Sequence, residues 1–344
     1  MFAKYPNHRL RGINHDGFTL VELMITLAVS AIIAICVYAS YSVQSKSFST
    51  QRQVSKIQQD MRGALYLMES DLLNACRDPN MTDRYRLTDI RWYGFTEGAD
   101  LDNVMGPNPF VLVAPPNSIY FTSYPVLEFA SLRRDADGDG IGDAPVTIRY
   151  QVYDFNNDGR PDFGRRSANG AGIGVIAGDP FNSRLVAEGV VAVGYAFAFN
   201  NKDNPDGKYE ISRTPPVAGG DPLGNIIWAV DSDGDNELDT NIDITGDGEI
   251  TLADDISGDG IINAGDGAGA ALAAPVKIDR VVAVRIWLLI QSERESPENV
   301  IDRNQYVVAD RIIPNPAANP NGFQDRFKRR VKTVTIALRN YRKS

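Results

Sequence analysis

A stretch of 23 uncharged residues near the amino terminus constrains this chain more than any other feature. From Leu23 to Ser45 no side chain carries a charge. An α-helix needs about 20 apolar residues to cross a bilayer, so the stretch predicts a membrane-spanning helix. Residues 1–17 before it are polar and basic, which predicts that the amino terminus lies in the cytoplasm.

The junction between Gly17 and Phe18 precedes the apolar stretch. A secretory signal peptide would be cut after its apolar region, whereas a cut at this junction leaves the helix on the mature protein. The segment G-F-T-L-V-E, which ends at Glu22, resembles the prepilin signature of type IV pilins and type II secretion pseudopilins. The resemblance implies that a prepilin peptidase removes residues 1–17 as a leader peptide and methylates the new amino terminus at Phe18.

Glu22 places a carboxylate at the edge of the apolar span, where a charge is costly and indicates a function with a partner. In pilin-like proteins the matching glutamate pairs with the terminal amine of a neighbouring subunit, so the resemblance implies other pilins as partners. It also implies a location in the bacterial inner membrane, and then in a pilus at the cell surface or in the periplasm. The alternative is a plain membrane anchor whose glutamate lies near the headgroups.

The helix is expected to continue beyond the membrane. Apolar residues recur there at spacings of three and four, at Val54, Ile57, Met61, Leu65, Met68 and Leu72. This spacing predicts an amphipathic helix, and Pro79 is a suitable terminator. We therefore predict one helix of about 55 to 60 residues, with a transmembrane or filament-core part at 18–45 and an amphipathic part at 46–78.

Short β-type runs separated by turn-rich stretches predict a globular head over residues 79–344. Strands are expected at Ser118–Tyr124, Val146–Phe155, Leu185–Phe199, Ile226–Val230, Val276–Ser292, Gln305–Ile313 and Val331–Leu338. Apolar and polar residues alternate in the last of these, which favours a mostly antiparallel sheet with one face on the helix. The predicted fold class is α+β, a pilin-like lollipop with a long N-terminal helix.

Two stretches, MRGALYLMESDLLNACRDP and TVTIALRNYR, resemble the minor pilins of the PilW type and the related J-type pseudopilins. The resemblance implies a minor pilin that helps to prime or cap a type IV pilus. A pseudopilin of a type II secretion system is one alternative. A calcium-dependent adhesin at a filament tip is another, because acidic insertions are predicted at 135–162 and 231–266.

Acidic side chains are concentrated in one segment. Residues 231–266 hold twelve carboxylates and no Lys or Arg, in a chain whose formal net charge is -9. Such a block repels itself unless cations bind within it, and its acidity argues against nucleic acid as a partner. The only histidines, His8 and His15, lie in the predicted leader, which excludes histidine catalysis from the mature chain. We therefore expect that the chain is not an enzyme. The alternative is an enzyme with a catalytic pair of carboxylic acids like that of a glycosidase.

Five acidic segments repeat the spacing D-x-[DNST]-x-D, mostly followed by Gly. Oxygen ligands at positions one, three and five, with Gly at position six for a sharp turn, suit a loop around Ca²⁺. Several structural calcium ions are therefore predicted. The predicted ligands are Asp135, Asp137, Asp139, Asp143, Asp154, Asn156, Asp158, Asp162, Asp231, Asp233, Asp235, Asp239, Asp243, Thr245, Asp247, Asp254, Asp255, Ser257, Asp259 and Asp266.

The segments that begin at Asp243 and Asp255 have the most complete pattern. Each has an acidic residue at position twelve and an Ile at position eight, so both resemble dockerin-type calcium loops. Together with the segment that begins at Asp231, they follow one another at intervals of twelve residues. The alternative interpretation, a run of solvated Asp-Gly turns, explains the glycines but not this interval.

Overall fold

A computed structural model gives the structure of most of the predicted helix and just over half of the head. The described residues are 19–75, 91–93, 126–131, 146–153, 160–169, 184–200, 226–232, 237–267, 269–277, 281–297, 300–317 and 319–338. The chain divides into two compact units, Met1–Thr50 and Gln51–Ser344. The predicted cleavage junction and the predicted strand Ser118–Tyr124 lie outside the described residues.

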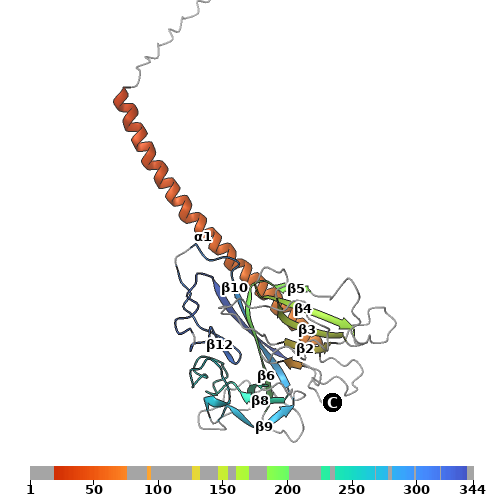
Figure 1. Ribbon diagram of the computed structural model, residues 1–344. Helices are drawn as coiled ribbons and strands as arrows, with labels where there is room; N and C mark the ends of the chain where they lie inside the picture. The colour runs from red at the N-terminus through yellow and green to blue at the C-terminus, as the bar shows by residue number, and fades with distance from the viewer. Residues whose placement is uncertain are drawn as a thin grey trace, which may run out of the picture. The chain divides into compact units, whose positions relative to one another are not determined.

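The long N-terminal helix is confirmed. Helix α1 covers Leu20–Ala75 without interruption, 56 residues in all (Figure 1). Within the first unit its side chains are nearly all exposed, including large apolar ones such as Leu20 at 74% and Tyr38 at 74%. By length and composition this helix could cross a membrane. An apolar surface of this extent is unusual for a soluble monomer and marks a surface that meets lipid or other subunits.

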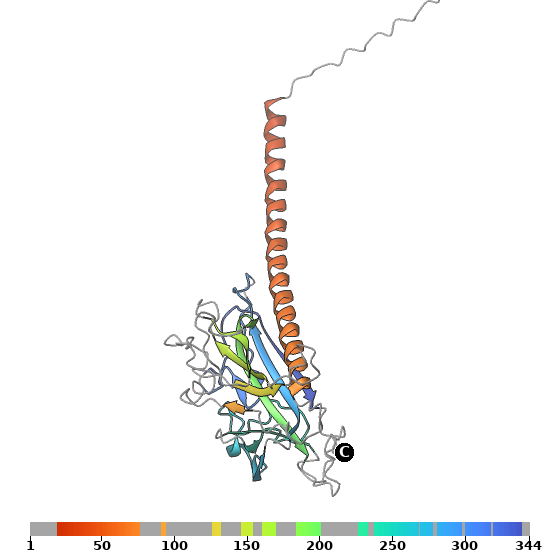
Figure 2. The ribbon, with the colours of Figure 1, turned by 90° about the vertical axis from the view of Figure 1, so that its right-hand side faces the viewer.

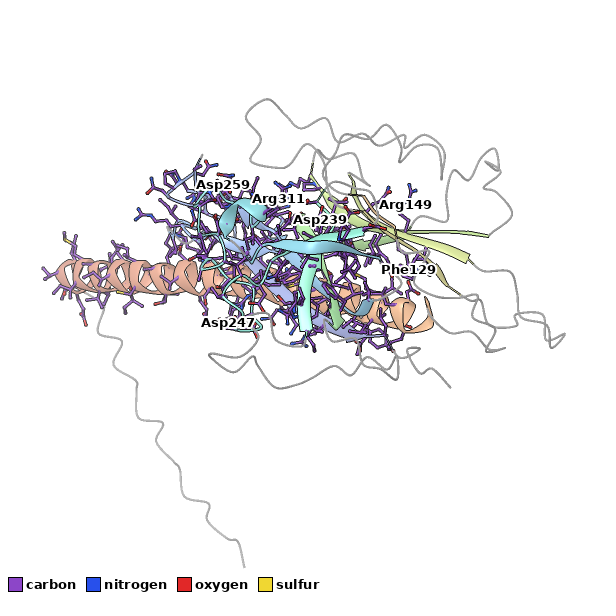
Figure 3. The ribbon with its side chains drawn as sticks, turned by 90° about the horizontal axis from the view of Figure 1, so that it is seen from below. Phe129, Arg149, Asp239, Asp247, Asp259 and Arg311 are labelled. Carbon is purple, nitrogen blue, oxygen red and sulfur yellow. The ribbon has the colours of Figure 1, made fainter. Side chains whose placement is uncertain are left out.

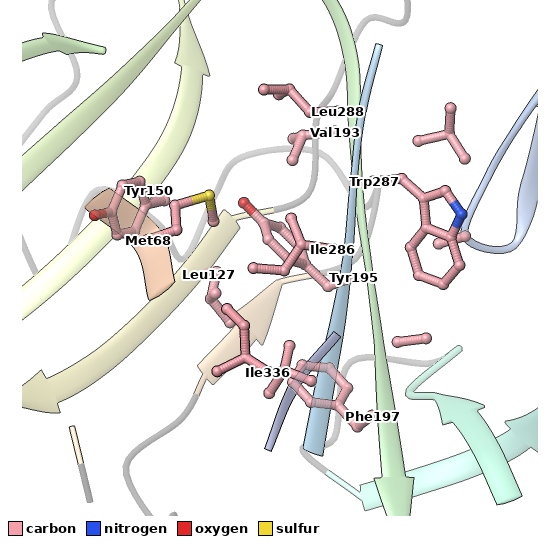
Figure 4. Close-up of a cluster of buried hydrophobic side chains, with 14 of the residues drawn as sticks. Met68, Leu127, Tyr150, Val193, Tyr195, Phe197, Ile286, Trp287, Leu288 and Ile336 are labelled. Carbon is pink, nitrogen blue, oxygen red and sulfur yellow. The ribbon is translucent and has the colours of Figure 1, made fainter. Parts of the chain in front are cut away.

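In the second unit, α1 buries the predicted stripe. Ile57, Met61, Leu65, Met68 and Leu72 are all at most 5% exposed, and they belong to the core of the head. Figure 4 shows Met68 beside Tyr150 and Tyr195, which belong to two different sheets. Spacings of three and four therefore did place these side chains on one buried face of the helix.

The larger sheet has six strands, in the order β13-β10-β6-β7-β8-β9, and every neighbouring pair is antiparallel. The bounds in chain order are β6 Val190–Asn200, β7 Ile226–Val230, β8 Glu237–Asn241, β9 Ala271–Lys277, β10 Val281–Gln291 and β13 Arg329–Ala337. The central strands β6 and β10 are buried along almost their whole length, because both faces of the sheet are covered there. The two views of Figures 1 and 2 show the part of α1 that belongs to the second unit running along one of these faces.

A second antiparallel sheet has five strands, in the order β1-β2-β3-β4-β5. The bounds are β1 Arg91–Tyr93, β2 Val126–Ser131, β3 Val146–Tyr153, β4 Asp162–Asn169 and β5 Arg184–Ala187. Asp71 near the end of α1 accepts hydrogen bonds from Arg165 Nε at 2.6 Å and from the Tyr150 hydroxyl at 2.5 Å. One helix carboxylate thus joins α1 to strands β3 and β4.

A hairpin of β11 Tyr306–Val308 and β12 Arg311–Ile313 covers the other face of the six-stranded sheet. Gly194 in β6 makes this contact possible, since an added Cβ would lie 2.8 Å from Ala309 Cβ and 2.9 Å from Val308 Cγ1. Figure 4 places Trp287 of β10 on the side of the strands opposite Tyr195 and Met68. The six-stranded sheet is therefore packed on both of its faces.

The α+β class with a long N-terminal helix and antiparallel sheets is confirmed, but several strand bounds were wrong. Three predicted single runs, Leu185–Phe199, Val276–Ser292 and Gln305–Ile313, each contain parts of two strands. Strands β1, β2, β4 and β8 were not predicted. In β4 and β8, charged and small polar residues with low strand preference hide the pattern.

Candidate functional site: the helix start and two acidic loops

Thr19 defines the start of α1. Its hydroxyl accepts a hydrogen bond from the Glu22 backbone N–H at 3.2 Å, and its carbonyl accepts one from Leu23 at 3.1 Å. This is the N-cap arrangement of a Thr followed three residues later by Glu. Glu22 is exposed and lies in the first turn, where the helix dipole favours a negative charge. The sequence contained this capping signal, although Thr19 was not singled out.

The first acidic loop, residues 243–254, is closed by its own carboxylates. Asp243 at position one accepts hydrogen bonds from the backbone N–H groups of Asp247 and Gly248 at 3.1 and 2.9 Å. Asp254 at position twelve accepts from Thr245 at 2.9 Å and Thr251 at 2.8 Å, that is, from positions three and nine. Asp254 is fully buried. The two end residues therefore hold the loop in a tight turn.

The second acidic loop, residues 255–266, repeats the contacts of position twelve and the bond from position six to position one, although its other donor to position one is position four rather than five. Asp255 accepts from Gly258 and Gly260 at 2.8 and 2.9 Å. Asp266 accepts from Ser257 and Asn263, again positions three and nine, both at 2.8 Å. The loops adjoin without a linker, because Asp254 is followed directly by Asp255. A run of independent Asp-Gly turns would not produce two copies of one closed loop.

Glycine is required at the same positions of both loops. Gly248 and Gly260 at position six have φ values of 85° and 87°, which L side chains rarely adopt. Their surroundings differ. A Cβ on Gly260 would lie 2.6 Å from Pro316 Cδ, whereas a Cβ on Gly248 would have nothing within 4 Å. The second loop is therefore packed against another part of the head at this point.

Negative charge is crowded in the first loop. Burial raises the pKa of Asp243 from its usual 3.8 to about 6, and repulsion from Asp254 and Asp247 adds to the effect. Carboxylate oxygens that accept backbone hydrogen bonds retain lone pairs for a cation. Among the described residues, however, no three carboxylate, histidine or cysteine side chains are gathered closely enough to hold a metal ion. Calcium binding thus stays a prediction.

Each loop is attached to the head by different groups. The Gly248 carbonyl of the first loop accepts a hydrogen bond from Arg285 Nη1 at 3.0 Å. The Arg285 guanidinium lies 4.0 Å from the Trp228 ring centroid, and its Nε donates to Thr335 Oγ1 at 3.2 Å. Burial lowers the pKa of Arg285, while Glu249 and Asp243 raise it. One side chain thus links the first loop to strands β7, β10 and β13.

Backbone hydrogen bonds attach the second loop to the β11–β12 hairpin. Ile262 N–H donates to the Asp310 carbonyl at 2.8 Å, and Ile312 N–H donates to the Gly260 carbonyl at 3.0 Å. Asn315 Nδ2 also donates to the Asp259 carbonyl at 2.8 Å. Figure 3 shows Asp259 near Arg311 and well apart from Asp247 of the first loop. Arg285 and Asn315 were both missed from the sequence, since each is distant along the chain from the loop it contacts.

The remaining predicted ligands are less informative. Asp239 lies in β8 and accepts hydrogen bonds from the backbone N–H and hydroxyl of Ser232 at 3.1 and 2.8 Å. Asp162 begins β4, is 1% exposed and accepts a hydrogen bond from Gly189 N–H at 3.3 Å, and Asp231 is also buried. The predicted ligands outside the described residues are Asp135, Asp137, Asp139, Asp143, Asp154, Asn156, Asp158, Asp233 and Asp235.

Two family models match the chain, one at each end. Residues 14–37 match the prokaryotic N-terminal methylation motif, and residues 262–340 match the type IV pilus-assembly protein W family. The second match covers β9 to β13 and the end of the second acidic loop. Comparison with curated protein sequences found no match. Among solved structures, the type IV-like pilin TTHA1219 from Thermus thermophilus is similar over 83% of this chain and 99% of its own, at 12% identity and a TM-score of 0.33.

Proposed function

We propose that this chain is a type IV pilin-like protein that works as a minor pilin, because its two ends match the prokaryotic N-terminal methylation motif and the type IV pilus-assembly protein W family. In this proposal a prepilin peptidase cuts between Gly17 and Phe18, and the processed chain waits in the inner membrane until it enters a type IV pilus. It is a structural subunit and not an enzyme. The observation that carries the proposal is the apolar helix of the first unit, whose large apolar side chains are exposed.

The exposed helix and Glu22 support packing between subunits. Side chains on every face of residues 20–49 are exposed in the single chain, apart from one partly exposed residue, so they can be buried only by lipid or by other subunits. Glu22 lies two residues after the first helical residue, close to the amino terminus that cleavage would create. A carboxylate at this depth in lipid requires a partner of opposite charge, and the amine of a neighbouring pilin would be suitable.

We also propose that calcium stabilises the head through the two described acidic loops. Asp243, Asp247 and Asp254 would hold one ion, and Asp255, Asp259 and Asp266 a second, with Thr245 and Ser257 at position three. The support is the hydrogen-bond pattern that the two loops share, together with the position of Asp243, whose pKa is raised by burial and, to a lesser degree, by repulsion from Asp254 and Asp247. Closing the site would require the carboxylates to turn toward the ion.

The pilin role is tested by deleting the gene and supplying it again as wild type, Glu22→Gln or Glu69→Gln. Both residues are exposed on the same helix, so Glu69→Gln is a matched control. We expect deletion and Glu22→Gln to remove surface filaments seen by electron microscopy, with protein secretion unchanged and Glu69→Gln like wild type. Intact filaments with blocked secretion would instead identify a type II secretion pseudopilin. Filaments that form but fail to attach would favour the adhesin.

A further inference from the structure

The free edge of strand β13 differs from the other sheet edges among the described strands. The five-stranded sheet ends in β1 and β5, which have only three and four residues. The six-stranded sheet ends on one side in β9, which contains Pro275 and pairs with a shifted register. Short strands, proline and irregular pairing all protect an edge from further pairing. On the other side, β13 has nine residues and pairs with β10 along its whole length without a shift.

Two hydrogen bonds establish which backbone groups of β13 point outward. Leu338 N–H donates to the Val282 carbonyl at 2.9 Å, and Ser292 N–H donates to the Lys328 carbonyl at 2.8 Å. In an antiparallel ladder the residues that bond to a given neighbour alternate, so even-numbered residues of β13 bond to β10. The odd-numbered residues, including Val331, Thr333 and Thr335, therefore direct their N–H and carbonyl groups away from β10.

The side chains of β13 leave this edge accessible. Arg330, Val331, Lys332, Thr333 and Thr335 are all exposed. Arg330 and Lys332 form no ion pair with the described residues, unlike the buried Arg329 of the same strand, which binds Asp302 and Asp325. Positive side chains on an edge oppose pairing with a neutral or basic strand, so this regular row of backbone donors and acceptors is open only to an acidic one.

We propose that the free edge of β13 pairs with an extended acidic segment of another pilin subunit, which adds a seventh strand to the sheet. That the partner is a pilin rests on the proposed function. Main-chain hydrogen bonds to Val331, Thr333 and Thr335 give such a junction its affinity, and carboxylates opposite Arg330 and Lys332 give it specificity. A second copy of this chain is disfavoured, because pairing two β13 strands brings four cations to one edge.

Proline substitutions test the pairing. Thr333→Pro removes an outward N–H and leaves the β10 ladder intact, whereas Val334→Pro removes a hydrogen bond to β10. We expect the purified Thr333→Pro protein to melt close to wild type, yet cells that carry it to lose most of their filaments, while Thr333→Ala keeps them. Wild-type filament numbers with Thr333→Pro would overturn the proposal. Val334→Pro should lower the melting temperature. That result would confirm that the even-numbered residues of β13 bond to β10.

A photo-crosslinking amino acid in place of Lys332 identifies the partner. Mass spectrometry of the adduct should find an acidic segment of another pilin subunit, and a combined Thr333→Pro change should abolish that adduct. An adduct with a second copy of this chain alone, or no adduct, would overturn the proposal. Glu22→Gln tests the pilin role separately, because filaments that survive Glu22→Gln contradict the proposed function whatever the crosslink shows.

Discussion

The two acidic loops have the same internal pattern but different attachments. Residues 243–254 and 255–266 are closed by equivalent aspartates that accept from equivalent backbone positions. The first loop receives side-chain hydrogen bonds from Arg285 and Asn241, whereas the second loop has main-chain bonds to the β11–β12 hairpin. A local motif therefore specifies how a loop closes, whereas its contribution to the stability of the head depends on residues far along the chain.

The largest expected effect is that of chelation, which tests whether both loops bind calcium. At a calcium concentration ten times the dissociation constant, each site contributes about 1.4 kcal/mol. EDTA should then lower the melting temperature of the head on the order of 5–10 °C, measured by circular dichroism. Asp254→Asn and Asp266→Asn should each remove about half of this shift. An unchanged melting curve in EDTA would contradict the calcium proposal.

Alanine substitutions at position six of each loop distinguish the cost of an unfavourable backbone φ from the cost of steric crowding. Gly248→Ala and Gly260→Ala introduce the same unfavourable φ, which costs about 1 kcal/mol. Only Gly260→Ala also forces a Cβ against Pro316 and Asn315, so it should cost roughly 1–2 kcal/mol more in urea unfolding. Equal costs for the two variants would mean that the second loop is not packed on the head as described.

Removing the side chains that attach the loops should have smaller effects. Arg285→Gln loses the contact with the Trp228 ring and the hydrogen bond to Gly248, and we expect a loss of about 1–2 kcal/mol in urea unfolding. Asn315→Ala should cost about 1 kcal/mol, since backbone bonds still hold the second loop. If Asn315→Ala proved the more costly, the side chain rather than the backbone would attach the second loop.

The last effect concerns pH and the first loop alone. Because the pKa of Asp243 is raised from 3.8 to about 6, the folded head binds a proton that the unfolded chain releases between these values. In calcium-free protein this contribution is fully present below about pH 4 and is lost as the pH rises through 6. The melting temperature of wild type in EDTA should therefore fall between pH 4 and 7, and it should fall further than that of Asp243→Asn. If the melting temperatures of wild type and Asp243→Asn changed equally with pH, Asp243 would not be the group responsible.

Local periodic patterns predicted α1 and the loops, because the residues that matter there are neighbours along the chain. The stripe from Ile57 to Leu72 and the twelve-residue interval are both of this kind. The contacts of Arg285 with Gly248 and of Asn315 with Asp259 span 37 and 56 residues, and no local pattern marks them. Strand β8, with the sequence ELDTN, is stabilised by its neighbours rather than by its own strand preference.

The direct junction of Asp254 and Asp255 has a consequence for how the head would respond to calcium. An ion that fixes Asp254 also fixes the backbone from which Asp255 extends, so the first ion bound removes part of the ordering cost of the second. We therefore expect a calcium titration with a Hill coefficient above one, and a value of one after three glycines are inserted between the two residues. In a filament subunit of this kind, the loops of the head would become ordered over a narrow range of external calcium concentration.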